Sequence, residues 1–122
     1  MGTYVKKGAN LLAIIINDGW WGNTPGHKQH LNLARLRAIE TRKWIVRSAN
    51  TGISAIINDR GEIVDTRPWD TMGAIKFSVP LSKQSTLYVT LGDFLYKLTL
   101  NLALLTLCWH LWHWLKQRLQ KK

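Results

Sequence analysis

Four histidines form two pairs whose spacing could serve metal chemistry. His27 and His30 are three positions apart, as are His110 and His113, so each pair would lie on one side of a helix. Two imidazoles provide half of a tetrahedral site, and no acidic side chain or thiolate accompanies either pair. The sequence therefore predicts neither a metal site nor a cofactor. We expect His30 to pack or form hydrogen bonds near the preceding loop, and His110 and His113 to lie among tryptophans.

Two other side-chain groups are candidates for acid, base or nucleophile chemistry. Cys108 is the single cysteine, so no disulfide forms within the chain. It lies in a long apolar segment, where a lone cysteine is most often a small hydrophobic residue, and no base can be placed beside it. Arg37 and Glu40 are three positions apart and can pair as ions, which we interpret as a structural contact.

The stretch NDGWWGNTPGHKQH, residues 17–30, has the composition of a binding loop. Trp20 and Trp21 follow a strongly apolar run, and the glycines around them let the backbone bend close to a ligand. The apolar run, residues 11–16, predicts a strand that is buried on both faces. Ligands of α/β folds gather at the carboxyl ends of strands, which is where this run delivers residues 17–21.

Helices are expected on both sides of this strand. MGTYVKKGAN, residues 1–10, predicts the last turns of a helix that stops at Gly8. Thr24 is suited to cap a second helix, with Pro25 at its first position, that runs to about Lys43. Apolar residues nearly surround this second helix, which predicts packing on more than one side.

The following residues predict the rest of a sheet. Strands are expected at residues 44–49, 53–58 and 62–67, the last two forming a hairpin in which Gly61 takes the left-handed position. GAIKFSVPL, residues 73–81, alternates as a further strand. Helices and strands in this order indicate an α/β or α+β sheet layer. The available helices cover one face of that sheet, so the other face requires a layer that this chain does not encode.

The charge is strongly basic and unevenly distributed. The formal net charge is +10, from 17 Lys and Arg against 7 Asp and Glu, and residues 94–122 carry five basic residues and no acid. Such a charge favours nucleic acid or an anionic membrane. The basic residues form no stripe interleaved with aromatics before the tail, so nucleic-acid binding is not predicted.

Residues 94–115, FLYKLTLNLALLTLCWHLWHWL, predict a transmembrane helix. Twenty-two helical residues span about 33 Å, close to the thickness of a bilayer hydrocarbon core. Tryptophans crowd one end and Tyr96 lies near the other, as expected for residues at the two interfaces. The basic tail KQRLQKK, residues 116–122, marks the cytoplasmic side, which places the residues before Phe94 outside the cytoplasm.

Several segments together resemble one family. NDGW at residues 17–20, QH at 29–30, ARLRAIE at 34–40 and RSANTG at 47–52 are similar to the later part of the nitrilase-like domain of bacterial apolipoprotein N-acyltransferases. The resemblance covers residues 2 to about 93, and an apolar helix with a basic tail also fits that family. Soluble nitrilases and carbamoylases share the sheet core but lack this tail.

The resemblance implies an α/β fold: part of a nitrilase-like αββα sandwich at residues 1–93, a transmembrane helix at 94–115 and a cytoplasmic tail at 116–122. It implies a multi-pass inner-membrane enzyme with a periplasmic catalytic domain. In the family, a cysteine thiolate takes an acyl chain from a phospholipid, and the α-amino group of a diacylglyceryl-cysteine lipoprotein then accepts it. A glutamate acts as general base and a lysine helps to hold the oxyanion.

This sequence departs from the family at the catalytic residues. The family's Glu, Lys and Cys would all precede Met1, Cys108 cannot replace the nucleophile, and Glu40 and Glu62 match no catalytic position. We therefore expect a C-terminal fragment that contains no catalytic residue and is inactive alone. The alternative is a small membrane-anchored protein that binds lipid or a partner without catalysis.

The resemblance also gives the aromatic loop a role. In the family this loop borders the active-site cleft, which must accept acyl chains, so Asn17, Trp20 and Trp21 are predicted to contact substrate. The flat apolar indole rings of the two tryptophans would line the cleft mouth. The alternative is that both tryptophans cover the core.

Overall fold

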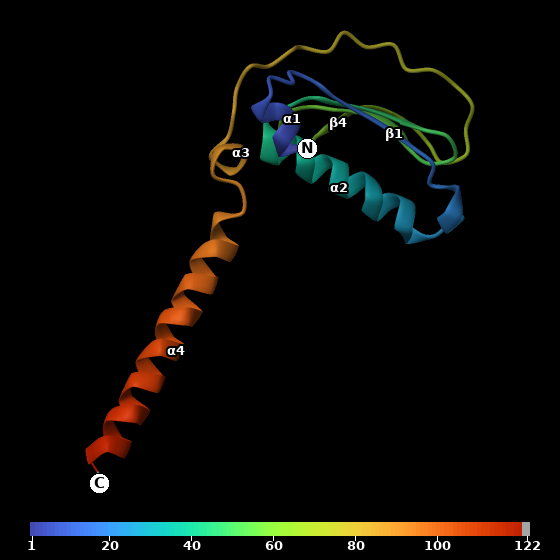
Figure 1. Cartoon of the computed structure of the whole chain (residues 1–122). Helices are drawn as coiled ribbons and strands as arrows, with labels where there is room; N and C mark the ends of the chain where they lie inside the picture. The colour runs from blue at the N-terminus through green and yellow to red at the C-terminus, as the bar shows by residue number, and fades with distance from the viewer. Residues whose placement is uncertain (121–122) are drawn as a thin grey trace. The chain divides into compact units, whose positions relative to one another are not determined.

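The computed structural model describes residues 1–120 and contains two compact units, Met1–Thr90 and a second that begins at Leu91. Figure 1 shows the elements of both units. In chain order they are α1 (Gly2–Lys6), β1 (Leu12–Ile16), the 3-10 helix η1 (Gly19–Trp21), α2 (Pro25–Thr41), β2 (Ile45–Ala49), β3 (Ser54–Ile57), β4 (Ile63–Arg67), α3 (Leu87–Leu91) and α4 (Phe94–Gln120).

The first unit is built on a four-stranded mixed sheet in the order β1-β2-β3-β4. β1 and β2 are parallel, with Leu12 opposite Ile45, and α2 connects them as a βαβ crossover. β2 pairs antiparallel with β3, and β3 with β4. This arrangement of helices and a mixed sheet confirms the predicted α/β layer.

α2 forms because its ends and one of its faces suit a packed helix. The Thr24 side chain accepts a hydrogen bond from the backbone N–H of Gly26 and Pro25 is the first helical residue, as predicted. Figure 1 shows α2 lying along one side of the sheet. Leu33 and Leu36 on the other side of α2 remain about half exposed, at 52% and 51%. The expectation of packing on more than one side is therefore wrong for the described chain.

The core lies between α2 and the facing side of the sheet. Its buried members come from α1, β1, α2, β2, β3 and α3, and they are Val5, Leu12, Leu31, Ala34, Ala38, Ile45, Ala55, Ile57 and Val89. On the opposite face of β1, Ile15 is 90% exposed, so the prediction that both faces of β1 are buried is wrong within residues 1–120. The second covering layer inferred from the sequence is not supplied by these residues.

The segment between β4 and α3 is extended but is not a strand. Residues 73–81 were expected to form one, because their apolar and polar residues alternate, yet they have no regular structure. A strand requires the backbone of a neighbouring strand, and this segment instead passes over the outer face of the sheet, where Ala74 and Ile75 border a hollow above Ile56. Trp44 stacks on Phe77 at 5.7 Å between ring centroids. Side-chain contacts, and not a hydrogen-bond ladder, therefore hold the segment.

The predicted hairpin between β3 and β4 is confirmed. Gly61 has a φ of +79° in its turn, and a Cβ there would lie 2.8 Å from Ile39 Cδ1. Both the backbone angle and the close approach of α2 exclude larger residues. Gly8 likewise ends α1 with a φ of +98°.

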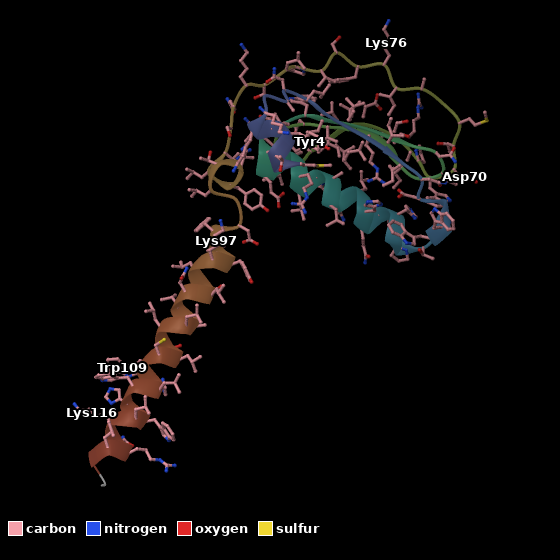
Figure 2. All side chains as sticks on the ribbon, viewed as in Figure 1. Tyr4, Asp70, Lys76, Lys97, Trp109 and Lys116 are labelled. Carbon is pink, nitrogen blue, oxygen red and sulfur yellow. The ribbon has the colours of Figure 1, made fainter. Side chains whose placement is uncertain are left out.

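The second unit consists mainly of α4, and one candidate span, Phe94–Leu119, is long and apolar enough to cross a membrane, with a mean hydropathy of 1.3. The side chains of residues 94–119 are exposed, and Figure 2 shows side chains projecting from both visible sides of α4. The predicted boundaries at residues 93 and 115 stay predictions, and residues 121 and 122 of the basic tail lie outside the described residues.

Lys43 joins the end of α2 to the extended segment. Its side chain is almost fully buried, and its Nζ donates hydrogen bonds of 2.6 Å to the carbonyl oxygens of both Ser82 and Gln84. Burial lowers the pKa of the Lys43 ammonium because the charged form loses water.

The lowered pKa of Lys43 predicts a pH-dependent stability. Between that pKa and the ordinary lysine value, the folded chain binds fewer protons than the unfolded chain, so the free energy of unfolding rises with pH across this window. We expect the free energy of unfolding of the natural chain, relative to that of Lys43→Met, to rise with pH up to about pH 10.5, the ordinary lysine value. Urea denaturation measures it, with Lys76→Met on the exposed segment as the matched control. A difference that is flat or falls with pH would contradict the assignment.

Candidate functional site

The carboxyl ends of β1 and β2 meet at one edge of the sheet, because the two strands are parallel. The loop after β1 begins at Asn17 and the turn after β2 contains Thr51. Asn17 Oδ1 accepts hydrogen bonds from the Gly19 backbone N–H at 3.0 Å and from Thr51 Oγ1 at 3.4 Å. The aromatic loop therefore lies at the edge where ligands of α/β folds gather.

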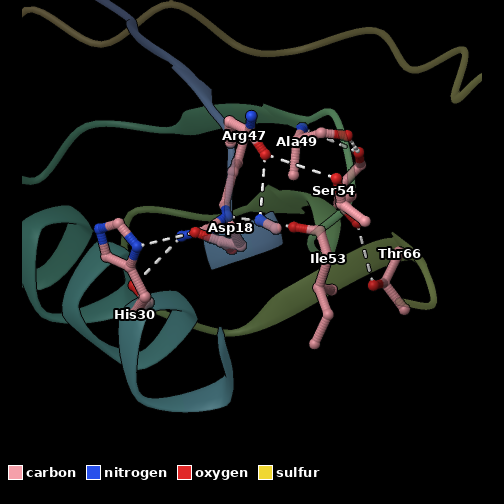
Figure 3. Close-up of polar contacts among 10 residues, drawn as sticks. Asp18, His30, Arg47, Ala49, Ile53, Ser54 and Thr66 are labelled. Atoms are coloured by element: carbon pink, nitrogen blue, oxygen red, sulfur yellow. Dashed lines mark hydrogen bonds and ion pairs between the residues drawn. The ribbon is translucent and has the colours of Figure 1, made fainter. Parts of the chain in front are cut away.

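A buried ion pair joins these two strand ends. The guanidinium of Arg47, in the middle of β2, donates through Nη2 to the carboxylate of Asp18, and each side chain is 1% exposed. Figure 3 shows this pair at the centre of a polar network. Neither charge could be buried alone at an acceptable cost in free energy, so each residue fixes the position of the other.

Arg47 also binds two carbonyl oxygens with its remaining donors. Its Nε donates to the carbonyl of Ile53 at 3.1 Å, and its Nη1 donates to the carbonyl of His30 at 3.1 Å. One planar guanidinium therefore connects the end of β1, the first turns of α2 and the residues before β3.

His30 connects the ion pair to the aromatic loop. Its Nδ1 is 2.9 Å from Asp18 Oδ1, and because the ionised carboxylate only accepts, Nδ1 carries the proton. The His30 ring meets the Trp21 ring edge-on, with 5.0 Å between centroids. This confirms that His30 forms a hydrogen bond near the loop, as expected from the sequence.

The turn after β2 accommodates Asp18 through Gly52. A Cβ at Gly52 would lie 2.8 Å from Asp18 Cγ, closer than carbon atoms pack. The glycine in the motif RSANTG is therefore required by the buried carboxylate.

The three residues predicted to contact substrate lie together on this edge but differ in exposure. Trp20 is 88% exposed and Trp21 is 44% exposed, and Asn17 is also exposed. An indole with this exposure does not cover the core of residues 1–120, so Trp20 is available to a ligand. The role of these residues in substrate binding stays a prediction.

A hollow of about 230 Å³ lies beside the network, between Met1, β1, β2 and α2. It brings His30, Arg37 and Arg47 to a wall that also contains Ile14 and Leu33. The predicted Arg37–Glu40 pair is present at 2.5 Å, and this hydrogen bond raises the pKa of Arg37. The single thiol of the chain, Cys108, is on α4, so the first unit contains none.

The remaining acidic and histidine candidates are occupied by structural contacts. Glu62 accepts a hydrogen bond of 2.6 Å from Asn58 Nδ2. His27 is buried and its ring packs on Trp69, with 4.4 Å between ring centroids and the ring planes tilted by 34°; its Nδ1 has no hydrogen-bond partner among the described residues.

Comparison with known proteins identifies the fold. The sequence pattern of the carbon-nitrogen hydrolase family matches residues 1–87. The chain belongs to this family. The carbon-nitrogen hydrolase unit is therefore the one that carries the Asp18–Arg47 pair and the aromatic loop.

Curated relatives of this carbon-nitrogen hydrolase chain are named apolipoprotein N-acyltransferases. It is 34% identical over 103 residues to the protein of Chlorobaculum tepidum and 35% identical over 103 residues to that of Thermotoga maritima, each match covering 84% of the chain. The protein of Bradyrhizobium diazoefficiens is 44% identical over 79 residues, or 65% of the chain. The chain spans 19%, 20% and 15% of these relatives. The resemblance inferred from the motifs is confirmed.

Sequence reasoning did not identify Asp18 and Arg47 as a pair. A signal was present, because Arg47 lies between Ile45 and Ala49 on the inward side of an apolar strand. An arginine at such a position requires a buried acid, and Asp18 directly follows the neighbouring strand.

Removing one partner of this pair is expected to destabilise the carbon-nitrogen hydrolase unit strongly. Asp18→Asn leaves the Arg47 guanidinium buried without its counter-charge, which we expect to lower the free energy of unfolding by about 3–5 kcal/mol. Glu40→Gln breaks the more exposed pair with Arg37 and should lower it by less than about 1 kcal/mol. Thermal and urea unfolding measure both.

Replacing both partners distinguishes the effect of an unpaired buried charge from the effect of lost packing. Asp18→Leu combined with Arg47→Met removes both buried charges and should recover most of the stability that Asp18→Asn loses. Equal effects of Asp18→Asn and Glu40→Gln would show that the buried pair does not hold the strand ends.

Proposed function

We propose that this chain is part of an apolipoprotein N-acyltransferase. The enzyme would move an acyl chain from a phospholipid to the N-terminal amine of a diacylglyceryl-cysteine lipoprotein through a cysteine thioester. Dividing the transfer into two steps replaces one difficult attack by an amine with two easier acyl exchanges.

The extent of the similarity carries this proposal. The relatives match 103 residues, which is more than the 87 residues matched by the carbon-nitrogen hydrolase pattern, so the match must include part of residues 88–122. That region contains the apolar helix α4. Sharing the hydrolase core and adjoining residues supports a membrane acyltransferase over a soluble nitrilase.

The chain would contribute the substrate loop and the final membrane helix of that enzyme, and not its nucleophile. Cys108 is exposed on α4, within the segment proposed to cross the membrane, far along the chain from the aromatic loop. We therefore assign no catalytic residue to these 122 residues and propose that they are inactive alone.

The proposed location is the bacterial inner membrane, as part of a multi-pass protein. The basic residues after α4 favour a cytoplasmic tail, by the excess of Lys and Arg found on that side of membranes. With one crossing by α4, the carbon-nitrogen hydrolase unit would face the periplasm, where lipoprotein amines and the outer leaflet are accessible.

A chimera tests the assignment. We expect that replacing the matching segment of the Thermotoga maritima relative with this chain keeps N-acylation of lipoproteins, and that the 122-residue chain alone gives none. Mass spectrometry of lipoprotein N-terminal peptides from cells depleted of their own enzyme measures both. A chimera whose upstream cysteine is changed to alanine is the control. A folded, membrane-inserted chimera without activity would contradict the proposal, as would activity of the chain alone.

The aromatic loop is tested in the same chimera. Trp20→Ala with Trp21→Ala removes two apolar surfaces, and we expect the KM for phospholipid to rise about tenfold, the effect of losing roughly 1.4 kcal/mol of apolar contact. The KM for the lipoprotein acceptor should stay unchanged. Trp20→Phe with Trp21→Phe keeps apolar rings and should restore most of the affinity. Unchanged phospholipid kinetics in the folded alanine variant would remove the loop from the substrate site.

A further inference from the structure

The carboxyl-terminal part of α4 carries a group of polar and aromatic side chains that neither the fold nor the proposed acyl transfer uses. Trp109, His110, His113, Trp114 and Gln117 line a shallow surface hollow on one side of the helix. We name these five residues the α4 hollow. Polar side chains on an otherwise apolar membrane helix cost free energy unless they contact water, lipid headgroups or a ligand.

The depth of the α4 hollow along the helix places it at a membrane boundary. At 1.5 Å per residue, His110 lies about 24 Å and Gln117 about 35 Å from Phe94 along the axis. A hydrocarbon core is about 30 Å thick. If α4 enters the core near Phe94, the hollow extends from the last turn within hydrocarbon to the first turn among headgroups.

The geometry of the helix sets two cations beside the hollow. At 100° per residue, its five residues occupy an arc that begins at Trp109 and ends at Trp114, with the two histidines and Gln117 between them. Lys116 lies next to the Trp109 side of this arc and Arg118 next to the Trp114 side. The Arg118 guanidinium carbon is 4.9 Å from the centroid of the Trp114 ring, which orients this cation along the edge of the hollow. Trp109 and Lys116 both point outward from α4 in Figure 2.

The histidines have different partners. His110 Nδ1 donates to the carbonyl oxygen of Thr106 at 2.9 Å, so its other ring nitrogen, Nε2, is left for an external group. The His113 ring packs on Trp109 with 4.6 Å between centroids. The hollow thus offers hydrogen-bonding nitrogens beside aromatic rings, with Lys116 and Arg118 on its two sides, and residues 94–122 contain no acidic residue to compete.

We propose that the α4 hollow binds the headgroup of an anionic phospholipid of the surrounding leaflet, of the phosphatidylglycerol type. Lys116 would neutralise the phosphodiester from the Trp109 side, and Arg118 would add positive charge on the Trp114 side. His110 and Gln117 would bond to the headgroup hydroxyls, and the tryptophans would lie against the glycerol backbone. The inference depends on α4 crossing the membrane, as in the proposed function, and not on acyl transfer.

Lipid retention tests the proposal. The full 122-residue chain in detergent micelles is titrated with phosphatidylglycerol or phosphatidylcholine of identical acyl chains, and native mass spectrometry counts the bound lipids. We expect phosphatidylglycerol to bind roughly tenfold more tightly, because its net negative charge attracts the two flanking cations and its headgroup hydroxyls form hydrogen bonds with His110 and Gln117. His110→Leu with His113→Leu and Gln117→Leu should reduce this preference to about twofold, because only the flanking cations remain.

Control variants distinguish lipid binding at the α4 hollow from attraction by positive charge alone. Thr99→Leu with Asn101→Leu changes polar residues of the same helix outside the hollow and should leave the preference intact. Equal binding of the two lipids would overturn the proposal. A preference unaffected by the three leucine substitutions but lost in Lys116→Gln with Arg118→Gln would also overturn it, as would displacement of the lipid by inorganic phosphate alone.

A separate measurement identifies which inference fails. Alkaline carbonate extraction of vesicles that contain the chain reports whether α4 is embedded. Release of the chain would overturn both the span and the headgroup site. Retention with equal binding of the two lipids would overturn the headgroup site alone and leave the proposed acyltransferase role standing.

Discussion

The burial of Arg47 is the interaction on which the arrangement of the first unit depends. A guanidinium inside a sheet layer is tolerated only when a carboxylate and further acceptors meet it, and here they come from the end of β1, from α2 and from the turn after β2. Any shift between these segments would leave a buried charge or donor without a partner. The strand ends are therefore held in one register, and Trp20 and Trp21 project from a fixed base. The buried Asp18–Arg47 ion pair therefore fixes the position of the exposed aromatic loop.

The first unit exposes apolar side chains on two of its sides. Ile15 on the outer face of the sheet is exposed, as are Leu33 and Leu36 on the outer side of α2, although their residue types favour burial. The chain spans 19% and 20% of the length of the Chlorobaculum tepidum and Thermotoga maritima relatives. We interpret the open sheet face as the inner face of the sandwich implied by the resemblance, and this interpretation belongs to the proposed acyltransferase.

Local signals in the sequence were enough for α1, α2 and the β3–β4 hairpin, but they did not predict the short helices η1 and α3. Thr24 and Pro25 start α2, and Gly61 closes the β3–β4 turn, because each effect acts within a few residues. The prediction of a strand at residues 73–81 was wrong because a strand depends on more than local sequence. Alternating apolar and polar residues suit the two faces of a strand, but a strand also needs the backbone of a neighbouring strand. Burial on both faces of β1 and on several sides of α2 was expected from composition, which does not reveal whether the covering atoms belong to the same chain. Asp18 and Arg47 are 29 positions apart in the sequence. The family motifs contain both residues but do not indicate that they form an ion pair.

We propose that the buried Asp18–Arg47 pair presents the aromatic loop to phospholipid acyl chains. The most direct measurement is photo-cross-linking, in the active chimera, from a phospholipid that carries a photoreactive group on its acyl chain, followed by mapping of the labelled residues by mass spectrometry. We expect labels at Trp20 and Trp21, their loss when Asp18→Asn releases the loop, and no label at Lys28 on the exposed start of α2. Labelling that avoids residues 17–21 in an active protein would contradict it.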